Sequence, residues 1–157
     1  MKIAFLCTHN ACRSILSEAV TRELAGNYIQ VASAGSAPSG KVHPLTLRHL
    51  EQRGYPVSGL HSKSIEALEA FQPDAVITVC DQAAREPCPV WLGNAVVTHW
   101  GLPDPSRLDS TEAEVDKAFE AVIKTIEARA LELIRVLPLD TQADQLKQTL
   151  DKIGEQD

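Results

Sequence analysis

Near its N-terminus the sequence places a cysteine and an arginine at the two ends of a short loop. Five residues separate Cys7 from Arg13, and Ser14 follows directly. A loop of this length can turn its backbone N–H groups inward at the start of a helix, which makes a binding site for tetrahedral oxyanions. Arg13 adds a fork of donors for two of the anion's oxygens. The residues whose backbone would line this site are Thr8, His9, Asn10, Ala11 and Cys12.

The same positive surroundings favour the thiolate of Cys7, which is the nucleophilic form of cysteine. Ser14 can donate a further hydrogen bond to that sulfur. The alternative is a buried structural cysteine beside a surface arginine. The sequence around the loop favours the catalytic interpretation, because residues 2–6 read as a buried strand and helical spacing of apolar residues begins at Arg13.

Further strands and helices alternate along the rest of the chain. Strands are expected at residues 28–33, 74–79 and 95–98, and helices at 44–53, 65–70 and 111–136. This alternation predicts an α/β fold of three layers, in which a four-stranded parallel sheet of order 2-1-3-4 is flanked by helices. The cysteine loop would lie at the carboxyl end of the first strand, where open parallel sheets bind ligands.

One domain is expected over residues 1–137, followed by a polar helical tail over residues 138–157. Leu146, Leu150 and Ile153 form a weak apolar stripe in that tail, which we interpret as a short docked or frayed surface helix.

Composition limits the partners and the compartment. A net charge of −6 argues against nucleic acid and anionic membranes, so an anion must be bound by a local field. No segment approaches the roughly 20 apolar residues of a membrane span, and no cleavable signal pattern precedes the first strand, so we expect a cytoplasmic protein. In a reducing compartment four cysteines suggest catalysis, redox chemistry or metal binding. Their spacing is unlike that of zinc sites, and we expect no metal there.

The loop from Cys7 to Ser14, together with the later run Gly101-Leu102-Pro103-Asp104-Pro105, resembles the low-molecular-weight tyrosine phosphatase superfamily and, within it, the arsenate reductases. The resemblance extends from residue 1 to about residue 136. It implies that Cys7 is the nucleophile and that Asp104 is a general acid for the leaving oxygen. A turn role for Asp104 before proline is compatible with this.

The resemblance also implies a support for the loop. Asn10, Glu18 and Ser33 match positions that brace it or, in some members, help to bind a potassium ion. Glu18 could instead be an ordinary surface charge on its helix.

Two further cysteines favour the reductases over the phosphatases. Cys80 ends the third strand and Cys88 follows eight residues later, whereas a phosphatase needs a single thiolate. In a reductase Cys7 would attack arsenate, Cys80 would attack Cys7 with release of arsenite, and Cys88 would move the disulfide outward. Thioredoxin would then reset the enzyme, with glutaredoxin and glutathione as the other donors. Alternatively, Cys80 and Cys88 are small buried hydrophobic residues.

Strand order supports that chemistry, because Cys7 and Cys80 would end neighbouring strands. Such strands lie about 4.8 Å apart, and a disulfide needs Cα atoms within about 4.4–6.8 Å of each other. The polar residues between Cys80 and Cys88 suggest a mobile loop. Cys12 either packs beneath the anion loop or could trap Cys7 as a disulfide.

Departures from the phosphatase pattern favour a small inorganic anion such as arsenate, with phosphate or sulfate as mimics. His9 stands where those loops usually have glycine, and no aromatic residue follows Asp104-Pro105 to form a slot for phosphotyrosine. A tyrosine phosphatase remains the alternative enzyme, and a non-catalytic oxyanion or redox sensor is the third possibility.

Overall fold

Four short strands form one sheet in the computed structural model, which describes residues 1–86, 93–136 and 143–155. The strands are β1 (Lys2–Cys7), β2 (Gln30–Gly35), β3 (Ala75–Thr78) and β4 (Val96–His99). The helices are α1 (Arg13–Ala25), α2 (Pro44–Gln52), α3 (Asp81–Arg85), α4 (Glu112–Val136) and α5 (Ala143–Glu155), and short 3-10 turns occur at η1 (Ile65–Leu68) and η3 (Pro105–Arg107).

All strand pairs are parallel, and the order is β2-β1-β3-β4, which confirms the predicted topology. In the register of the sheet Cys7 lies opposite Gly35 of β2, and Leu6 lies opposite Thr78 of β3. Parallel strands end at the same edge of the sheet. The loop after β1 and the segment after β3 therefore emerge side by side.

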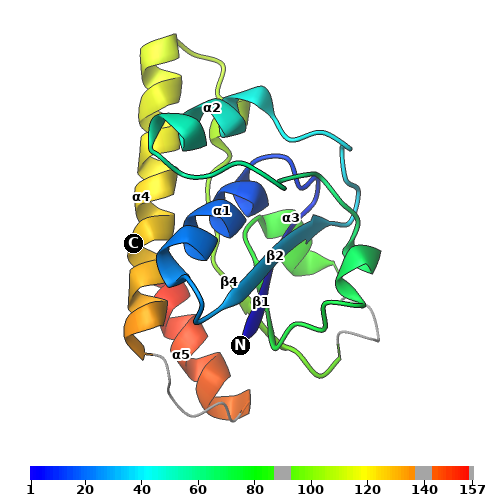
Figure 1. Ribbon diagram of the computed structural model, residues 1–157. Helices are drawn as coiled ribbons and strands as arrows, with labels where there is room; N and C mark the ends of the chain where they lie inside the picture. Colours follow the sequence, from blue (N-terminus) through cyan, green and yellow to red (C-terminus); the bar gives the residue numbers. More distant parts are fainter. Residues whose placement is uncertain (87–92, 137–142, 156–157) are drawn as a thin grey trace.

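Side chains of β1 alternate between the two faces of the sheet, as the pleat of a strand requires. Ile3 and Phe5 belong to the larger core cluster, which α1, α4 and α5 complete. Ala4 and Leu6 point to the opposite face, where they pack with Leu68 of η1. Figure 1 shows α4 and α5 on one side of the sheet and the segment around residues 65–70 on the other, so the predicted three layers are present.

Most element bounds shift by one or two residues from the sequence-based prediction, and two changes have a clear cause. Strand β2 begins at Gln30 and not at residue 28, because the backbone of Tyr28 still donates to Ala25 O in the turn after α1 and its side chain is 75% exposed. The first part of the predicted mobile loop between Cys80 and Cys88 forms helix α3 over Asp81–Arg85. The Cys80 sulfur caps this helix by accepting a hydrogen bond from Ala83 N at 3.4 Å.

The C-terminal helix α5 docks on the core through the predicted apolar stripe, which is the docked and not the frayed form of the expected helix. Leu146, Leu150 and Ile153 are 8%, 0% and 2% exposed and belong to the main cluster. Trp100, which follows β4, donates from its indole N–H to the carbonyl of Leu150 at 2.8 Å. The predicted domain boundary at residue 137 lies outside the described residues.

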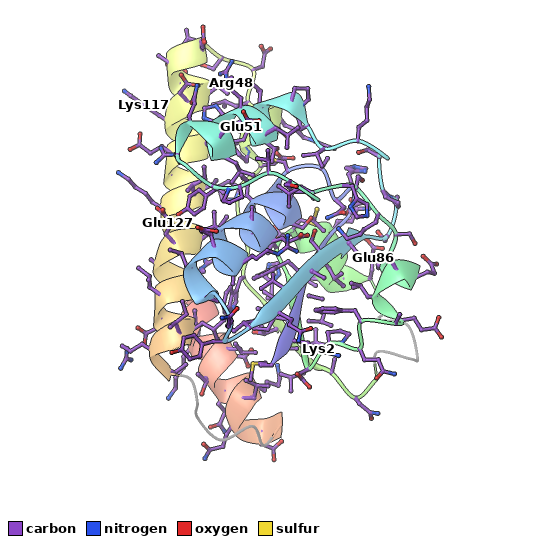
Figure 2. All side chains as sticks on the ribbon, viewed as in Figure 1. Lys2, Arg48, Glu51, Glu86, Lys117 and Glu127 are labelled. Carbon is purple, nitrogen blue, oxygen red and sulfur yellow. The ribbon has the colours of Figure 1, made fainter. Side chains whose placement is uncertain are left out.

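Charged side chains cover the outer surface of the helical layer. Figure 2 labels Arg48 and Glu51 on α2 and Lys117 on α4 at the edge of the molecule. Arg48 also lies 3.3 Å from Asp116 of α4, which links these two helices. In the described parts of the chain no helix combines the length and the apolar character needed to cross a lipid bilayer.

Candidate active site

The loop between β1 and α1 is fixed by hydrogen bonds that its carbonyl groups accept from a second loop. The carbonyls of Thr8, His9 and Ala11 accept backbone hydrogen bonds of 2.9–3.0 Å from a second loop, residues 37–43. Bonds of this kind fix the carbonyls on the outer side of the loop, so the N–H groups are left to face the sulfur of Cys7. Asn10 N donates to that sulfur at 3.3 Å. The N–H group of Asn10 thus points inward, as the predicted oxyanion site requires.

A glycine at the end of β2 allows the anion loop to lie close to the sheet. A Cβ added to Gly35 would lie 2.5 Å from the carbonyl oxygen of Thr8 and 3.0 Å from Asn10 N. Such contacts would push the loop outward. The only side chain that fits here is a hydrogen atom, so Gly35 contributes to the site although sequence reasoning did not select it.

Cys7 is 4% exposed and lies at the base of this loop. Its sulfur is 3.1 Å from the hydroxyl oxygen of Ser14, as expected from the sequence. Arg13 begins α1, and its side chain is 21% exposed. The guanidinium donates to Leu102 O at 3.1 Å and lies 3.6 Å from the carboxylate of Asp104, so it is already oriented beside the cysteine loop.

Cys80 reaches the same site from the neighbouring strand. It is 3% exposed and follows β3, which is joined to β1 by a hydrogen bond from Val79 N to Leu6 O. Its sulfur contacts the hydroxyl of Thr8 at 3.7 Å and is hydrogen-bonded to the sulfur of Cys7. Both sulfurs are free thiols. The two cysteines that the strand order predicted to be neighbours thus lie together.

The two sulfurs change each other's acidity in opposite directions. The hydrogen bond from Cys7 lowers the pKa of Cys80 to about 5, and Ala83 N and Thr8 stabilise the same thiolate. Contact with Cys80, followed by burial, raises the pKa of Cys7 in turn, against the opposing effects of Ser14 and Asn10. The first proton of the pair is therefore lost more readily than the second, because the second thiolate would form beside the first. This modifies the expectation that Cys7 alone holds the thiolate.

Of the other predicted cysteines, Cys12 is placed and Cys88 is not. Cys12 is 5% exposed in the anion loop, and burial, the largest cause, raises its pKa to about 11. A thiol of this kind reacts slowly, which agrees with a packing role. Cys88 lies outside the described residues.

Asp104 follows β4 and lies beside Arg13 at the end of the anion loop. Its carboxylate accepts hydrogen bonds from the backbone N–H and hydroxyl of Ser106 at 3.0 and 2.6 Å. The guanidinium of Arg107 lies 3.5 Å from it. Asp104 therefore serves as the cap of the short η3 turn and also lines the pocket that contains Cys7.

The pocket above Cys7 has a volume of about 480 Å³ and extends beyond the anion loop. Residues that sequence reasoning did not select line its outer part: Ser39, Lys41, Val42, His43, Pro44, Ser106 and Arg107. Lys41 and Arg107 add positive charge, which suits an anionic ligand. The sequence gives no pattern that predicts Lys41 at the site, because the long loop before α2 brings residues 39–43 there only in the folded chain.

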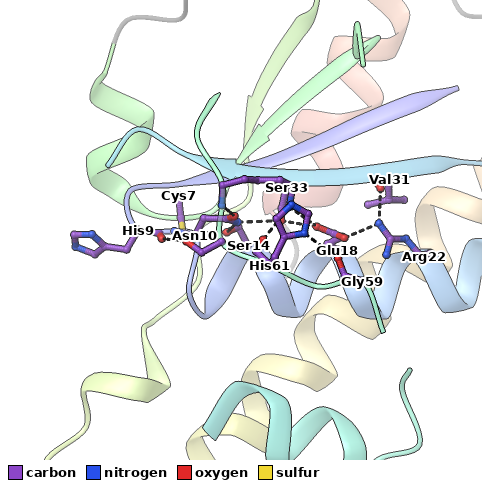
Figure 3. A network of polar contacts seen from close by, with 12 residues as sticks. Cys7, His9, Asn10, Ser14, Glu18, Arg22, Val31, Ser33, Gly59 and His61 are labelled. Atoms are coloured by element: carbon purple, nitrogen blue, oxygen red, sulfur yellow. Dashed lines mark hydrogen bonds and ion pairs between the residues drawn. The ribbon is translucent and has the colours of Figure 1, made fainter. Parts of the chain in front are cut away.

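A buried polar network supports the loop from below (Figure 3). Asn10, in the left-handed conformation at φ 49°, donates from its side-chain amide to Ser14 Oγ at 2.7 Å and to Ser33 Oγ at 2.9 Å. Ser33 donates to the carboxylate of Glu18 at 2.5 Å. Glu18 is 2% exposed, so it is a buried member of this network and not a surface charge.

The remaining loop residues lie around the rim. The ring of His9 is exposed, and its Nδ1 is 3.3 Å from Ala37 O. The carbonyl of Ala11 also accepts from the hydroxyl of Thr46 at 3.2 Å. Thr8, which is 8% exposed, links the loop to Cys80.

Comparison with known proteins agrees with this geometry. A glutaredoxin arsenate reductase from Synechocystis is 32% identical over 123 residues, which are 78% of this chain and 90% of that protein. A solved arsenate reductase in the phosphate binding state has a TM-score of 0.70 and 29% identity, over 85% of this chain and 96% of that one. The thioredoxin-dependent arsenate reductase of Corynebacterium glutamicum has a TM-score of 0.65 and 29% identity, over 86% of this chain and 62% of that one.

The family model described as low molecular weight phosphotyrosine protein phosphatase matches residues 2–154. This match includes the anion loop, Cys7, Cys80 and helix α5 up to residue 154. The chain therefore belongs to the low molecular weight phosphotyrosine protein phosphatase family.

Proposed function

We propose that this chain reduces arsenate to arsenite in the cytoplasm. The observation that carries the proposal is the second free thiol, Cys80, which is buried in contact with Cys7 at the base of the oxyanion loop. A phosphatase has no use for this thiol, whereas a two-electron reduction requires one. The relatives named as arsenate reductases give the same substrate.

The first step joins arsenate to the protein. The Cys80 thiolate takes the proton of Cys7, the resulting Cys7 thiolate attacks the arsenic to form a sulfur–arsenic bond, and one oxygen leaves as water. The inward N–H groups and Arg13 bind the remaining oxygens. Asp104 lies beside Arg13 and is the acid that protonates the leaving oxygen.

The second step transfers the electrons. The Cys80 thiolate attacks the sulfur of Cys7, so a sulfur–sulfur bond forms and the sulfur–arsenic bond breaks. The electron pair of the broken bond stays on arsenic, which leaves as arsenite, while the two cysteines become a disulfide. Cys80 gives up its proton before this attack, and Ala83 N and Thr8 remain to stabilise its thiolate.

The last steps restore the dithiol. We propose that Cys88 attacks Cys80, releases Cys7, and presents a Cys80–Cys88 disulfide to an external dithiol. Thioredoxin is the favoured donor because a chain with three cysteines can pass the disulfide outward internally. Glutaredoxin with glutathione is the second candidate, and both kinds of donor occur in the names of relatives. All steps use sulfur and protons, so no resident cofactor is required.

A tyrosine phosphatase is the second candidate function, and the size of the pocket favours it. A volume of about 480 Å³ exceeds the needs of a tetrahedral oxyanion and leaves room for a larger phosphorylated group. Weak hydrolysis of an aryl phosphate is expected from any such loop, so only a comparison of catalytic efficiencies separates the two functions.

Arsenate reduction should be measured with thioredoxin and with glutaredoxin plus glutathione, each supplied alone, for the wild type, Cys80→Ser and Cys88→Ser. We expect turnover with thioredoxin in the wild type and loss of multiple turnover in Cys80→Ser. If Cys88→Ser retains turnover only with glutathione, the internal relay serves thioredoxin. Full multiple turnover by Cys80→Ser would rule the relay out. A higher efficiency on phosphotyrosyl peptide than on arsenate would assign the chain to the phosphatases.

A further inference from the structure

A lysine side chain lies against the carboxylate that supports the anion loop. The ammonium of Lys63 is 3.5 Å from Glu18 Oε1 and donates to His61 O at 3.1 Å. Only 16% of the Lys63 side chain is exposed, and only 3% of the Glu18 side chain. A lysine that is merely solvated does not show this degree of burial.

The backbone of Lys63 is fixed at both of its polar groups. Lys63 N donates to Asn10 Oδ1 at 2.9 Å, and Lys63 O accepts from Gly35 N at 2.9 Å. One residue thus contacts the loop through Asn10, the tip of β2 through Gly35, and the buried carboxylate through its ammonium. The position of this ammonium is therefore set by the fold and not by a flexible stem.

The residues present do not fit a potassium ion at this place. Both oxygens of Glu18 already face cationic groups, because Oε2 lies 2.5 Å from the guanidinium of Arg22 and Oε1 faces Lys63. Oε1 also accepts the hydroxyl of Ser33. A monovalent cation beside Glu18 would meet a fixed ammonium of the same charge, and like charges at such distances repel strongly in a buried site.

We propose that the Lys63 ammonium takes the place of a monovalent cation and makes the anion loop independent of potassium. It compensates the charge of Glu18, which a buried carboxylate requires. Glu18 then holds the Ser33 hydroxyl. Lys63 is a positioning residue, because it acts on the loop through other groups and does not touch the anion.

A continuous path connects Glu18, which contacts this ammonium, to the reacting sulfur of Cys7 (Figure 3). Glu18 accepts from Ser33, and Ser33 accepts from the Asn10 amide. The same amide donates to Ser14, whose hydroxyl is 3.1 Å from the sulfur of Cys7. Loss of the ammonium is therefore expected to loosen Asn10 and to weaken anion binding without removing any group that contacts the anion.

The test uses Lys63→Ala, which leaves room for an ion, and Lys63→Met, which keeps most of the stem. Lys124→Met is the matched control, because Lys124 lies 3.0 Å from Glu120 on the exposed face of α4. The dissociation constant for inorganic phosphate and the Tm are measured in potassium, ammonium, sodium and choline chloride at one ionic strength. This inference rests on the proposed anion site. Neither the phosphate dissociation constant nor the Tm depends on turnover, so the result can contradict the role of Lys63 without contradicting arsenate reduction.

We expect the wild type and Lys124→Met to have the same phosphate affinity and Tm in all four salts. In choline chloride Lys63→Ala should bind phosphate about tenfold more weakly, and potassium or ammonium should restore most of that loss. A potassium-specific gain in the wild type would overturn the inference, and so would a loss in Lys63→Ala that no cation restores. The wild-type comparison needs no variant, so it remains decisive if Lys63→Ala fails to fold.

Discussion

Removal of Cys80 should make Cys7 a stronger acid, although it deletes the sulfur that forms the second half of the redox pair. In the intact pair the Cys80 thiolate forms first, with a pKa of about 5, and contact with it raises the pKa of Cys7. In Cys80→Ala the largest cause of that increase is absent. The hydrogen bonds that Cys7 receives from Ser14 and Asn10 remain.

The size of the effect follows from the repulsion between two negative sulfurs. At a separation of about 4 Å and an effective dielectric constant of about 20, this repulsion is about 4 kcal/mol, which corresponds to about 3 pH units in a titration midpoint. In the variant the titration of Cys80 at low pH should be absent. The pKa of Cys7 should fall by roughly this amount.

Thiolate formation can be followed by ultraviolet absorbance, and each sulfur can be assigned by iodoacetamide labelling and peptide mass analysis. Both proteins should carry Cys88→Ser, so that the titrating thiols all lie in the described site. Cys12→Ala is the control, because the pKa of about 11 for Cys12 places its titration well above that of Cys80. The reasoning is refuted if Cys7 titrates at the same or a higher pH after Cys80→Ala.

Three further perturbations test other parts of the site and the fold. Gly35→Ala should weaken phosphate binding at least about tenfold by calorimetry while circular dichroism stays unchanged, because its Cβ would lie 2.5 Å from Thr8 O; unchanged affinity would mean that the loop does not depend on this close approach. Asp104→Asn should retain phosphate binding but slow aryl phosphate hydrolysis about 100-fold or more, as expected for loss of a general acid, and equal rates would exclude that role. Leu150→Ala should lower the free energy of unfolding by about 2–5 kcal/mol, measured as a single transition in urea, because Leu150 is fully buried. Leu131→Ala is the control and should have little effect, because Leu131 is 56% exposed. A separate early unfolding transition for α5 would contradict its place in the core.

Local pattern was sufficient to predict the elements that carry the nucleophile. The apolar run before Cys7 and the helical spacing after Arg13 specify β1, the anion loop and α1, and the alternation of strands and helices specifies the sheet order. That order alone brings Cys80 to Cys7, since the carboxyl ends of neighbouring parallel strands meet.

The parts that escaped prediction depend on contacts between distant segments. Helix α3 has only five residues and begins with a sulfur cap, which single-sequence periodicity does not register. The stripe on α5 is weak by itself and becomes a core face because Trp100 and β4 receive it. Lys63 lies 45 positions after Glu18 in the sequence, and only the pairing of its backbone with Gly35 and Asn10 reveals that the two side chains meet.

The most direct test of the account is the disulfide formed during one turnover with arsenate. Cys88→Ser should be reduced, mixed with arsenate without any thiol donor, quenched with an alkylating reagent and digested for peptide mass analysis. We predict a disulfide between Cys7 and Cys80 in an amount equal to the arsenite released, with Cys12 alkylated. Arsenite release with Cys80 still free, or with Cys7 joined to Cys12, would contradict the electron path proposed for this protein.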